Sequence, residues 1–60
     1  MVSDVERILA EARAKRERAK NIREVAFVMA RAQDQGRLAQ EADQLLFEAA
    51  VLEQQADGLH

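Results

Sequence analysis

The chain has 60 residues and a formal net charge of -2, and it contains no cysteine, proline, tryptophan or tyrosine. This composition excludes a disulfide-stabilised scaffold and a cysteine-based metal centre. It also disfavours a β-sheet protein, because threonine is absent and only Phe27 and Phe47 are aromatic. Alanine, leucine, glutamate, glutamine and arginine predominate, and most of these residues favour helix. We therefore expect one all-α domain over residues 1–60, too small to bury its apolar surface without a partner.

The first helix is expected over residues 4–33. Ser3 and Glu6 have the spacing of a capping box, in which the serine hydroxyl accepts a hydrogen bond from the backbone N–H three residues later. Asp4 also suits the positive end of the helix dipole. Asn21 leaves open a break within this segment, because asparagine is a common N-cap residue. A continuous helix with Asn21 facing solvent is the preferred interpretation.

A tight turn is expected over residues 34–36, followed by a second helix over residues 37–57. Gly36 can adopt the left-handed conformation that ends many helices. Asp34 can cap the helix that follows. Gly58 then suits the C-terminal end of the second helix.

Both predicted helices repeat apolar residues every seven positions, which is the spacing of a coiled coil. The repeats are Leu38, Leu45, Leu52 and Leu59 with Ala42, Ala49 and Ala56 in the second helix, and Ala12, Ala19 and Ala26 with Ile8, Lys15, Ile22 and Met29 in the first. If the chain folds back about the turn, residues whose numbers add up to 71 face each other, so Leu45 meets Ala26. Leu52 likewise meets Ala19, and a large side chain faces a small one at each level. The sequence predicts an antiparallel two-helix hairpin with a coiled-coil-like Ala/Leu seam.

Further apolar residues lie off this seam. In the predicted register the first helix is the longer one, so its N-terminal apolar residues project beyond the end of the second helix. Isolated exposed apolar residues need no explanation, but a contiguous cluster marks an interface. The expected interface consists of Val5, Ile8, Leu9, Phe27, Val28, Ala30, Leu46, Phe47, Ala50 and Val51. We expect it to bind a second copy, giving a homodimeric four-helix bundle, or a larger protein partner.

The residues that catalysis requires are missing from the sequence. Ser3 is better used as a cap, and His60 is the last residue, where helices fray. Glu41, Glu48 and Glu53 fall on flanking positions, and the Glu-x-x-His pair of di-metal bundles is absent. We therefore expect no enzymatic activity, no catalytic site, no cofactor and no metal.

No segment has the pattern of a membrane or targeting sequence. The longest apolar run covers residues 25–30, far short of the roughly 20 residues of a membrane span. The charged N-terminal segment also differs from a secretory signal peptide. A cytoplasmic protein that does not bind membranes is expected.

An alternative function follows from a basic stripe on the first helix. The stripe consists of Arg13, Arg16, Lys20 and Arg23, and Phe27 continues it. Basic groups beside an aromatic ring can bind phosphates and stack on loop bases. In length, two helices, short turn and Ala/Leu layers, the chain is similar to Rop-type proteins, helical hairpins that dimerise into a four-helix bundle and bind paired RNA loops. That resemblance implies a nucleic-acid-binding dimer as the alternative.

The preferred interpretation of the stripe is a solvated face that pairs with the acidic second helix, with Arg16 near Glu53. The sequence thus favours a non-enzymatic protein–protein interaction module. Such a module would act as a small adaptor, regulator or assembly/chaperone-like subunit that self-associates.

Overall fold

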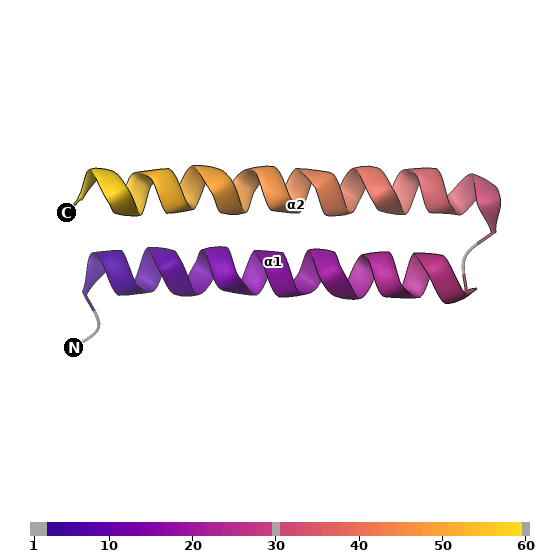
Figure 1. The fold of residues 1–60 in the computed structure, drawn as a ribbon, viewed down its shortest axis with the longest axis horizontal. Coiled ribbons are helices and arrows are strands. Elements are labelled where there is room, and N and C mark those ends of the chain that lie inside the picture. Colours follow the sequence, from indigo (N-terminus) through magenta and orange to yellow (C-terminus); the bar gives the residue numbers. More distant parts are fainter. Residues whose placement is uncertain (1–2, 30, 60) are drawn as a thin grey trace.

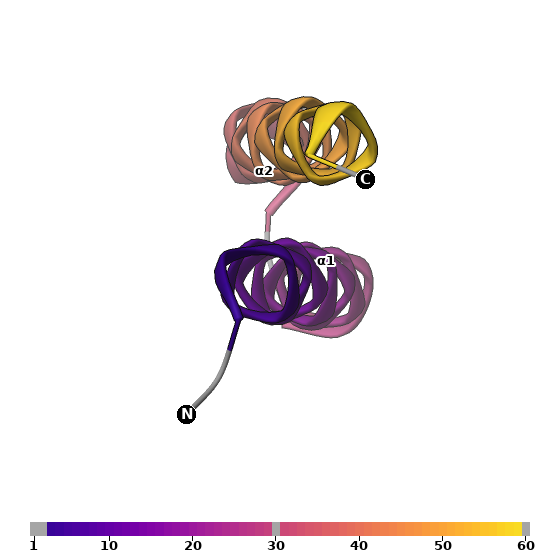
Figure 2. The same ribbon diagram turned by 90° about the vertical axis from the view of Figure 1, so that its left-hand side faces the viewer.

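The computed structural model describes residues 3–29 and 31–59 of the chain. Two helices account for nearly all of them: α1 is Asp4–Met29 and α2 is Ala32–Gly58. The helices run antiparallel and side by side, so that the N-terminal end of α1 lies beside the C-terminal end of α2 (Figure 1). Seen end-on they form a single layer, slightly inclined to each other (Figure 2). The predicted all-α antiparallel hairpin is confirmed.

The start of α1 follows the predicted cap. The Glu6 backbone N–H donates to the Ser3 hydroxyl oxygen at 3.1 Å, and the Arg7 N–H donates to the Ser3 carbonyl at 3.0 Å. Asp4 stands in the first turn and accepts a hydrogen bond from the Arg7 guanidinium at 2.7 Å. From there the helix continues through Asn21 without a break, as preferred from the sequence.

The predicted position of the turn is wrong. The chain reverses earlier than predicted, because α1 ends at Met29 and α2 starts at Ala32. Arg31 has an extended backbone (φ -69°, ψ 157°) and precedes the first residue of α2. Gly36 lies inside α2, and neither glycine has a positive φ. The local helix-ending preference of Gly36 is therefore overridden by packing between the helices.

Backbone and side-chain hydrogen bonds stabilise this earlier turn. The Arg31 carbonyl accepts hydrogen bonds from the Asp34 and Gln35 N–H groups, both at 2.9 Å. The Gln35 side-chain amide donates to the Ala26 carbonyl at 3.1 Å, which links the first turn of α2 to the last turn of α1. Asp34 is thus not an N-cap but a first-turn acid, favourable at the positive end of the helix dipole.

The core between the helices consists of alanines. The buried residues of the described chain are Ala12, Ala19, Ala26, Ala42, Ala49 and Ala56, each at most 7% exposed. They are the alanines of the predicted heptad repeat, so their inward position is confirmed. No large side chain is fully buried in the described ranges. Small residues along the contact line let the two backbones approach closely.

The earlier turn also changes the register. The cross-helix hydrogen bonds join residues whose numbers add up to between 61 and 69, below the predicted 71. Leu52 lines a groove with Glu11 and Lys15, next to Ala12, whereas the predicted register placed it against Ala19. The pairing of the helices is thus displaced from the predicted register towards the turn.

The predicted overhang of α1 is wrong for the same reason. With 26 and 27 residues the helices are nearly equal in length, and their ends are level (Figure 1). Val5 and Ile8 are therefore partly buried, and Leu9 is 37% exposed.

Within the described residues, neither helix has an apolar stretch with the length and hydropathy that a membrane span needs.

Candidate interaction surfaces

The alanine line divides the larger side chains of the hairpin between two sides. On a helix, the residue four before a buried alanine and the residue three before it lie on opposite sides of that alanine. Lys15 and Arg16 stand in this relation to Ala19, and Leu45 and Leu46 stand in it to Ala49. Each helix therefore presents one set of residues to each side of the hairpin.

We call one side the leucine face. It consists of Ile8, Lys15, Ile22, Val25 and Met29 of α1 and Leu38, Leu45, Leu52 and Leu59 of α2. Two grooves place its members together across the helices, because Lys15 and Leu52 line one of them and Ile22 and Leu38 line the other. The row is covered only in part: Val25 is 53% exposed, Met29 79% and Leu59 57%.

One ion pair crosses the middle of the leucine face. The Lys15 ammonium donates to a Glu48 carboxylate oxygen at 3.1 Å, and both side chains are partly buried. Lys15 occupies the heptad position that Ile8 and Ile22 occupy one repeat away. The apolar row of α1 is thus interrupted once, near its centre, by a charge that α2 neutralises.

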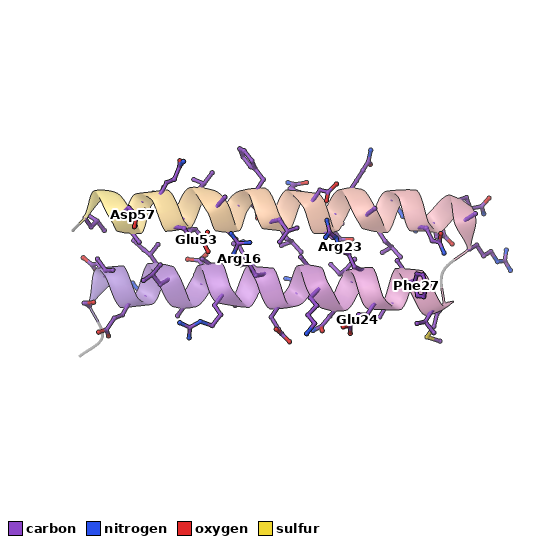
Figure 3. All side chains as sticks on the ribbon, in the orientation of Figure 1. Arg16, Arg23, Glu24, Phe27, Glu53 and Asp57 are labelled. Atoms are coloured by element: carbon purple, nitrogen blue, oxygen red, sulfur yellow. The ribbon has the colours of Figure 1, made fainter. Side chains whose placement is uncertain are left out.

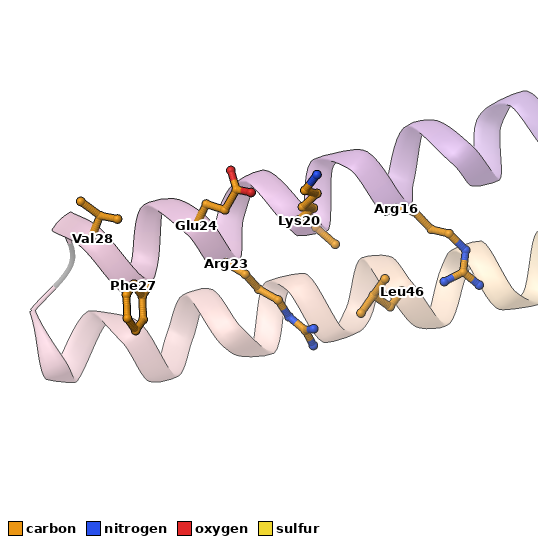
Figure 4. Close-up of a pocket in the computed structure, with 8 residues that line it drawn as sticks. Arg16, Lys20, Arg23, Glu24, Phe27, Val28 and Leu46 are labelled. Atoms are coloured by element: carbon orange, nitrogen blue, oxygen red, sulfur yellow. The ribbon is translucent and has the colours of Figure 1, made fainter.

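We call the opposite side the basic face. Its centre is a groove of about 390 Å³ lined by Arg16, Ala19, Lys20, Arg23, Glu24, Phe27, Val28 and Leu46 (Figure 4). Leu46 is the one lining residue from α2. In Figure 4 Arg16, Arg23 and Phe27 point towards α2, whereas Lys20 and Glu24 point away from it. Phe27 is 87% exposed, so its ring is almost uncovered.

Two ion pairs cross the basic face on either side of Leu46. The Arg16 guanidinium donates two hydrogen bonds to the Glu53 carboxylate, at 2.8 and 2.6 Å, and Arg23 donates one to Asp43 at 2.7 Å. Figure 3 shows Arg16 and Glu53 meeting between the helices. The predicted proximity of Arg16 and Glu53 is confirmed, although the register differs, because long side chains reach across more than one turn.

The same contact shifts two ionisation equilibria. Hydrogen bonds from the Arg16 guanidinium, together with its positive charge, hold the pKa of Glu53 below its ordinary value. The hydrogen bonds to Glu53 and its negative charge raise the pKa of Arg16. Both groups are therefore ionised throughout the neutral range.

The structure separates the interface residues that the sequence predicts. Phe27, Val28 and Leu46 line the basic groove, whereas Phe47 and Val51 line a second groove of about 350 Å³ together with Lys15 and Leu52. Ala50 is exposed, and Ala30 lies outside the described residues. Described members of the predicted interface thus lie in two different grooves.

The predicted basic stripe is brought together in part. Arg16, Lys20 and Arg23 line one groove with Phe27, but Arg13 does not line it. Arg16 and Arg23 are engaged with carboxylates of α2, while Lys20 makes no ion pair with the described residues. The stripe is thus locally compensated, as the preferred interpretation of the sequence holds.

Sequence reasoning missed the half-covered leucines as candidates for an interface. It assigned Leu38, Leu45 and Leu52 to the seam inside one hairpin, but all three are only partly buried. The alanine repeat could have revealed their position. Where an alanine occupies the inward position of the helix, the leucine three residues later must lie to one side of the contact line.

No group of three or more histidine, cysteine, aspartate or glutamate side chains in residues 3–29 and 31–59 is arranged to hold a metal ion. Comparison of the chain with protein-family models, with curated proteins and with solved structures gives no match. The fold defines the class to which the chain belongs, the antiparallel α-helical hairpins, and its function has to be argued from its surfaces.

Proposed function

We propose that the chain is a non-enzymatic protein–protein interaction module whose first partner is a second copy of itself, giving a homodimeric four-helix bundle. One observation carries the proposal: within residues 3–29 and 31–59 the buried side chains are all alanines, while the leucines, isoleucines and valines stay partly or largely exposed. A helix pair with this core gains little apolar burial, because an alanine side chain is one methyl group.

A second copy supplies the missing burial. Full burial of a leucine, isoleucine or valine side chain is favourable by about 1.5–3 kcal/mol. Val25, Met29 and Leu59 are each more than half exposed. Apolar side chains exposed to this degree at both ends of a small hairpin leave surface that a second copy can cover.

The remaining surfaces suit a larger partner. Phe27 and Phe47 are 87% and 70% exposed and lie on different grooves. Exposed aromatic rings beside charged rims are typical anchors for a helix or groove of another protein. We propose that the bundle acts as an adaptor, regulator or assembly subunit in the cytoplasm.

The test is the mass of the chain in solution together with its thermal unfolding. Light scattering over a hundredfold concentration range should give about twice the chain mass of 6.8 kDa. The midpoint of unfolding should rise with concentration, because association stabilises the folded state by mass action. A mass of one chain with a midpoint that does not move would contradict the proposal.

An RNA-binding dimer is the second candidate, favoured by the position of Lys20 and Phe27 in one groove. The ion pairs of Arg16 and Arg23 oppose it, because phosphate binding would have to compete with Glu53 and Asp43. A gel-shift assay with an RNA hairpin pair at about 50 mM salt separates the two. We expect no shift; a shift lost in the Lys20→Glu variant would favour the RNA-binding dimer instead.

A further inference from the structure

We infer that two copies pack through their leucine faces with both turns at the same end of the bundle. This inference rests on the proposed self-association and adds the surface and the orientation. The leucine face is the surface with apolar residues along the whole length of both helices, from Ile8 to Met29 and from Leu38 to Leu59. On the basic face, by contrast, two cross-helix ion pairs flank Leu46.

Two arrangements join the leucine faces about a two-fold axis. With both turns at the same end, α1 of each copy lies against α2 of the partner. With the turns at opposite ends, α1 lies against the partner's α1 and α2 against the partner's α2. The apolar rows are covered in both arrangements, so charge decides between them.

The charges of the two helices favour the same-end arrangement. The helix α1 carries seven basic and five acidic side chains, whereas α2 carries one basic and six acidic side chains. Placing α2 against a second α2 brings two strongly acidic helices together. Placing α1 against the partner's α2 instead brings unlike charges together, and unlike charges across an interface select orientation.

The Lys15–Glu48 ion pair gives a second, local argument for the same-end arrangement. Lys15 belongs to the leucine face, and its partner Glu48 lines the same groove as Leu52. Both lie within one turn of the midpoints of their helices, so a two-fold axis through that face brings the two copies of the pair close together. In the opposite-end arrangement Lys15 meets the partner's Lys15, and Glu48 meets the partner's Glu48. In the same-end arrangement each Lys15 lies across from the partner's Glu48, and four charges alternate in sign around the axis.

Arg18 adds to this preference. It lines the groove that Ile22 and Leu38 share, so it stands at the rim of the leucine face on α1. In the same-end arrangement it lies across from the acidic α2 of the partner, near the partner's Glu48. Like charges in a partly covered site repel more strongly than in water, so the opposite-end arrangement is disfavoured there.

Spin labels at single cysteines test the orientation, and the absence of native cysteine makes the labelling specific. A label at Gln33→Cys marks the turn end, and a label at Gln54→Cys marks the other end. Same-end packing predicts a separation of roughly 20–30 Å between like labels, the width of two packed helix layers. Opposite-end packing would add a separation along the bundle of about 36 Å between the two Gln33 labels and about 27 Å between the two Gln54 labels, so the Gln33 pair is the sharper test.

A mixed sample provides the internal control. When Gln33→Cys copies are mixed with Gln54→Cys copies, the distance between unlike labels should be long in the same-end bundle and short in the opposite-end one. Long distances between like labels would overturn the orientation but leave self-association intact. Absence of any dipolar coupling, with a mass of one chain, would instead refute the proposed function itself.

Charge substitutions test which face of the hairpin forms the dimer interface. Val25 lies on the leucine face and is largely exposed in one hairpin, so Val25→Glu should leave the hairpin folded and weaken dimerisation at least about tenfold. Ala14→Glu, on an exposed position of α1, should leave the dimerisation constant unchanged. Phe27→Glu examines the competing face. Loss of dimerisation in Phe27→Glu with retention in Val25→Glu would overturn the inference.

Discussion

The two sides of this hairpin share one backbone and one line of alanines, yet they differ in how their charges are arranged. On the basic face, Arg16 and Arg23 bind acids of α2 on either side of a single leucine. On the leucine face a single ion pair, Lys15–Glu48, interrupts an otherwise apolar row. The basic face therefore has two ion pairs that are closed within one chain, beside the exposed Phe27 and Val28. The leucine face has one ion pair, and its partly exposed apolar row extends along both helices.

The adjacent residues Leu45 and Leu46 provide the sharpest comparison of the two faces. Both are partly buried in one hairpin, so the single chain predicts similar costs for Leu45→Ala and Leu46→Ala. If a second copy covers the leucine face, Leu45→Ala should cost about 3 kcal/mol and Leu46→Ala about 1 kcal/mol. Urea unfolding at fixed protein concentration measures both values. Equal costs would mean that the leucine face has no partner.

Replacing a buried alanine between the helices by a larger residue should disturb both faces at once. Ala19 is 1% exposed, and a leucine at that position would overpack the contact between the helices. We expect Ala19→Leu to destabilise the protein by about 2 kcal/mol. Ala14→Leu, on an exposed position of the same helix, is the control and should change stability by less than about 0.5 kcal/mol. Equal tolerance at the two positions in a thermal melt would contradict the alanine core.

Replacement of Gly36 tests whether the turn of the hairpin depends on a glycine at this position. It lies within α2 without a positive φ, and a Cβ atom added to it meets no atom within 4 Å. Gly36→Ala should therefore stabilise the protein by about 1 kcal/mol, through lower backbone entropy in the unfolded chain. Destabilisation in a denaturant titration would show that the turn needs glycine after all.

The smallest expected effect comes from the Arg16–Glu53 pair of the basic face. Because the folded-state pKa of Glu53 is lowered, its contribution is present above the unfolded-state pKa of about 4.3 and is lost as the pH falls through the folded-state value. Glu53→Gln should therefore lower the melting midpoint slightly at pH 7, and the difference should shrink as the pH falls through the folded-state pKa of Glu53. Added salt should reduce the difference at pH 7 as well, because both side chains are exposed. A difference in melting midpoint that does not change with pH would assign the effect to something other than the carboxylate charge.

Sequence reasoning identified the capped start of α1, its continuity through Asn21, the antiparallel pairing and the inward alanines. Each of these depends on local chemistry or on a seven-residue period that neighbouring residues repeat. The position of the turn was not identified, because Gly36 is a strong local signal for a helix end and Arg31 is not. Helix formation over residues 32–36 is favoured only once α2 has α1 to pack against.

The register shows why periodicity alone is insufficient. A shift of the paired helices by seven residues again sets three leucines opposite three alanines, so the pattern is satisfied both before and after the shift. The tertiary structure selects the alternative in which helices of 26 and 27 residues are level, so that neither helix projects beyond the other. The amino-acid sequence alone thus determined two amphipathic helices with alanines on their contact line. Only their packing determined where the chain turns and which leucines face outward, since both depend on the total area that the two helices cover together.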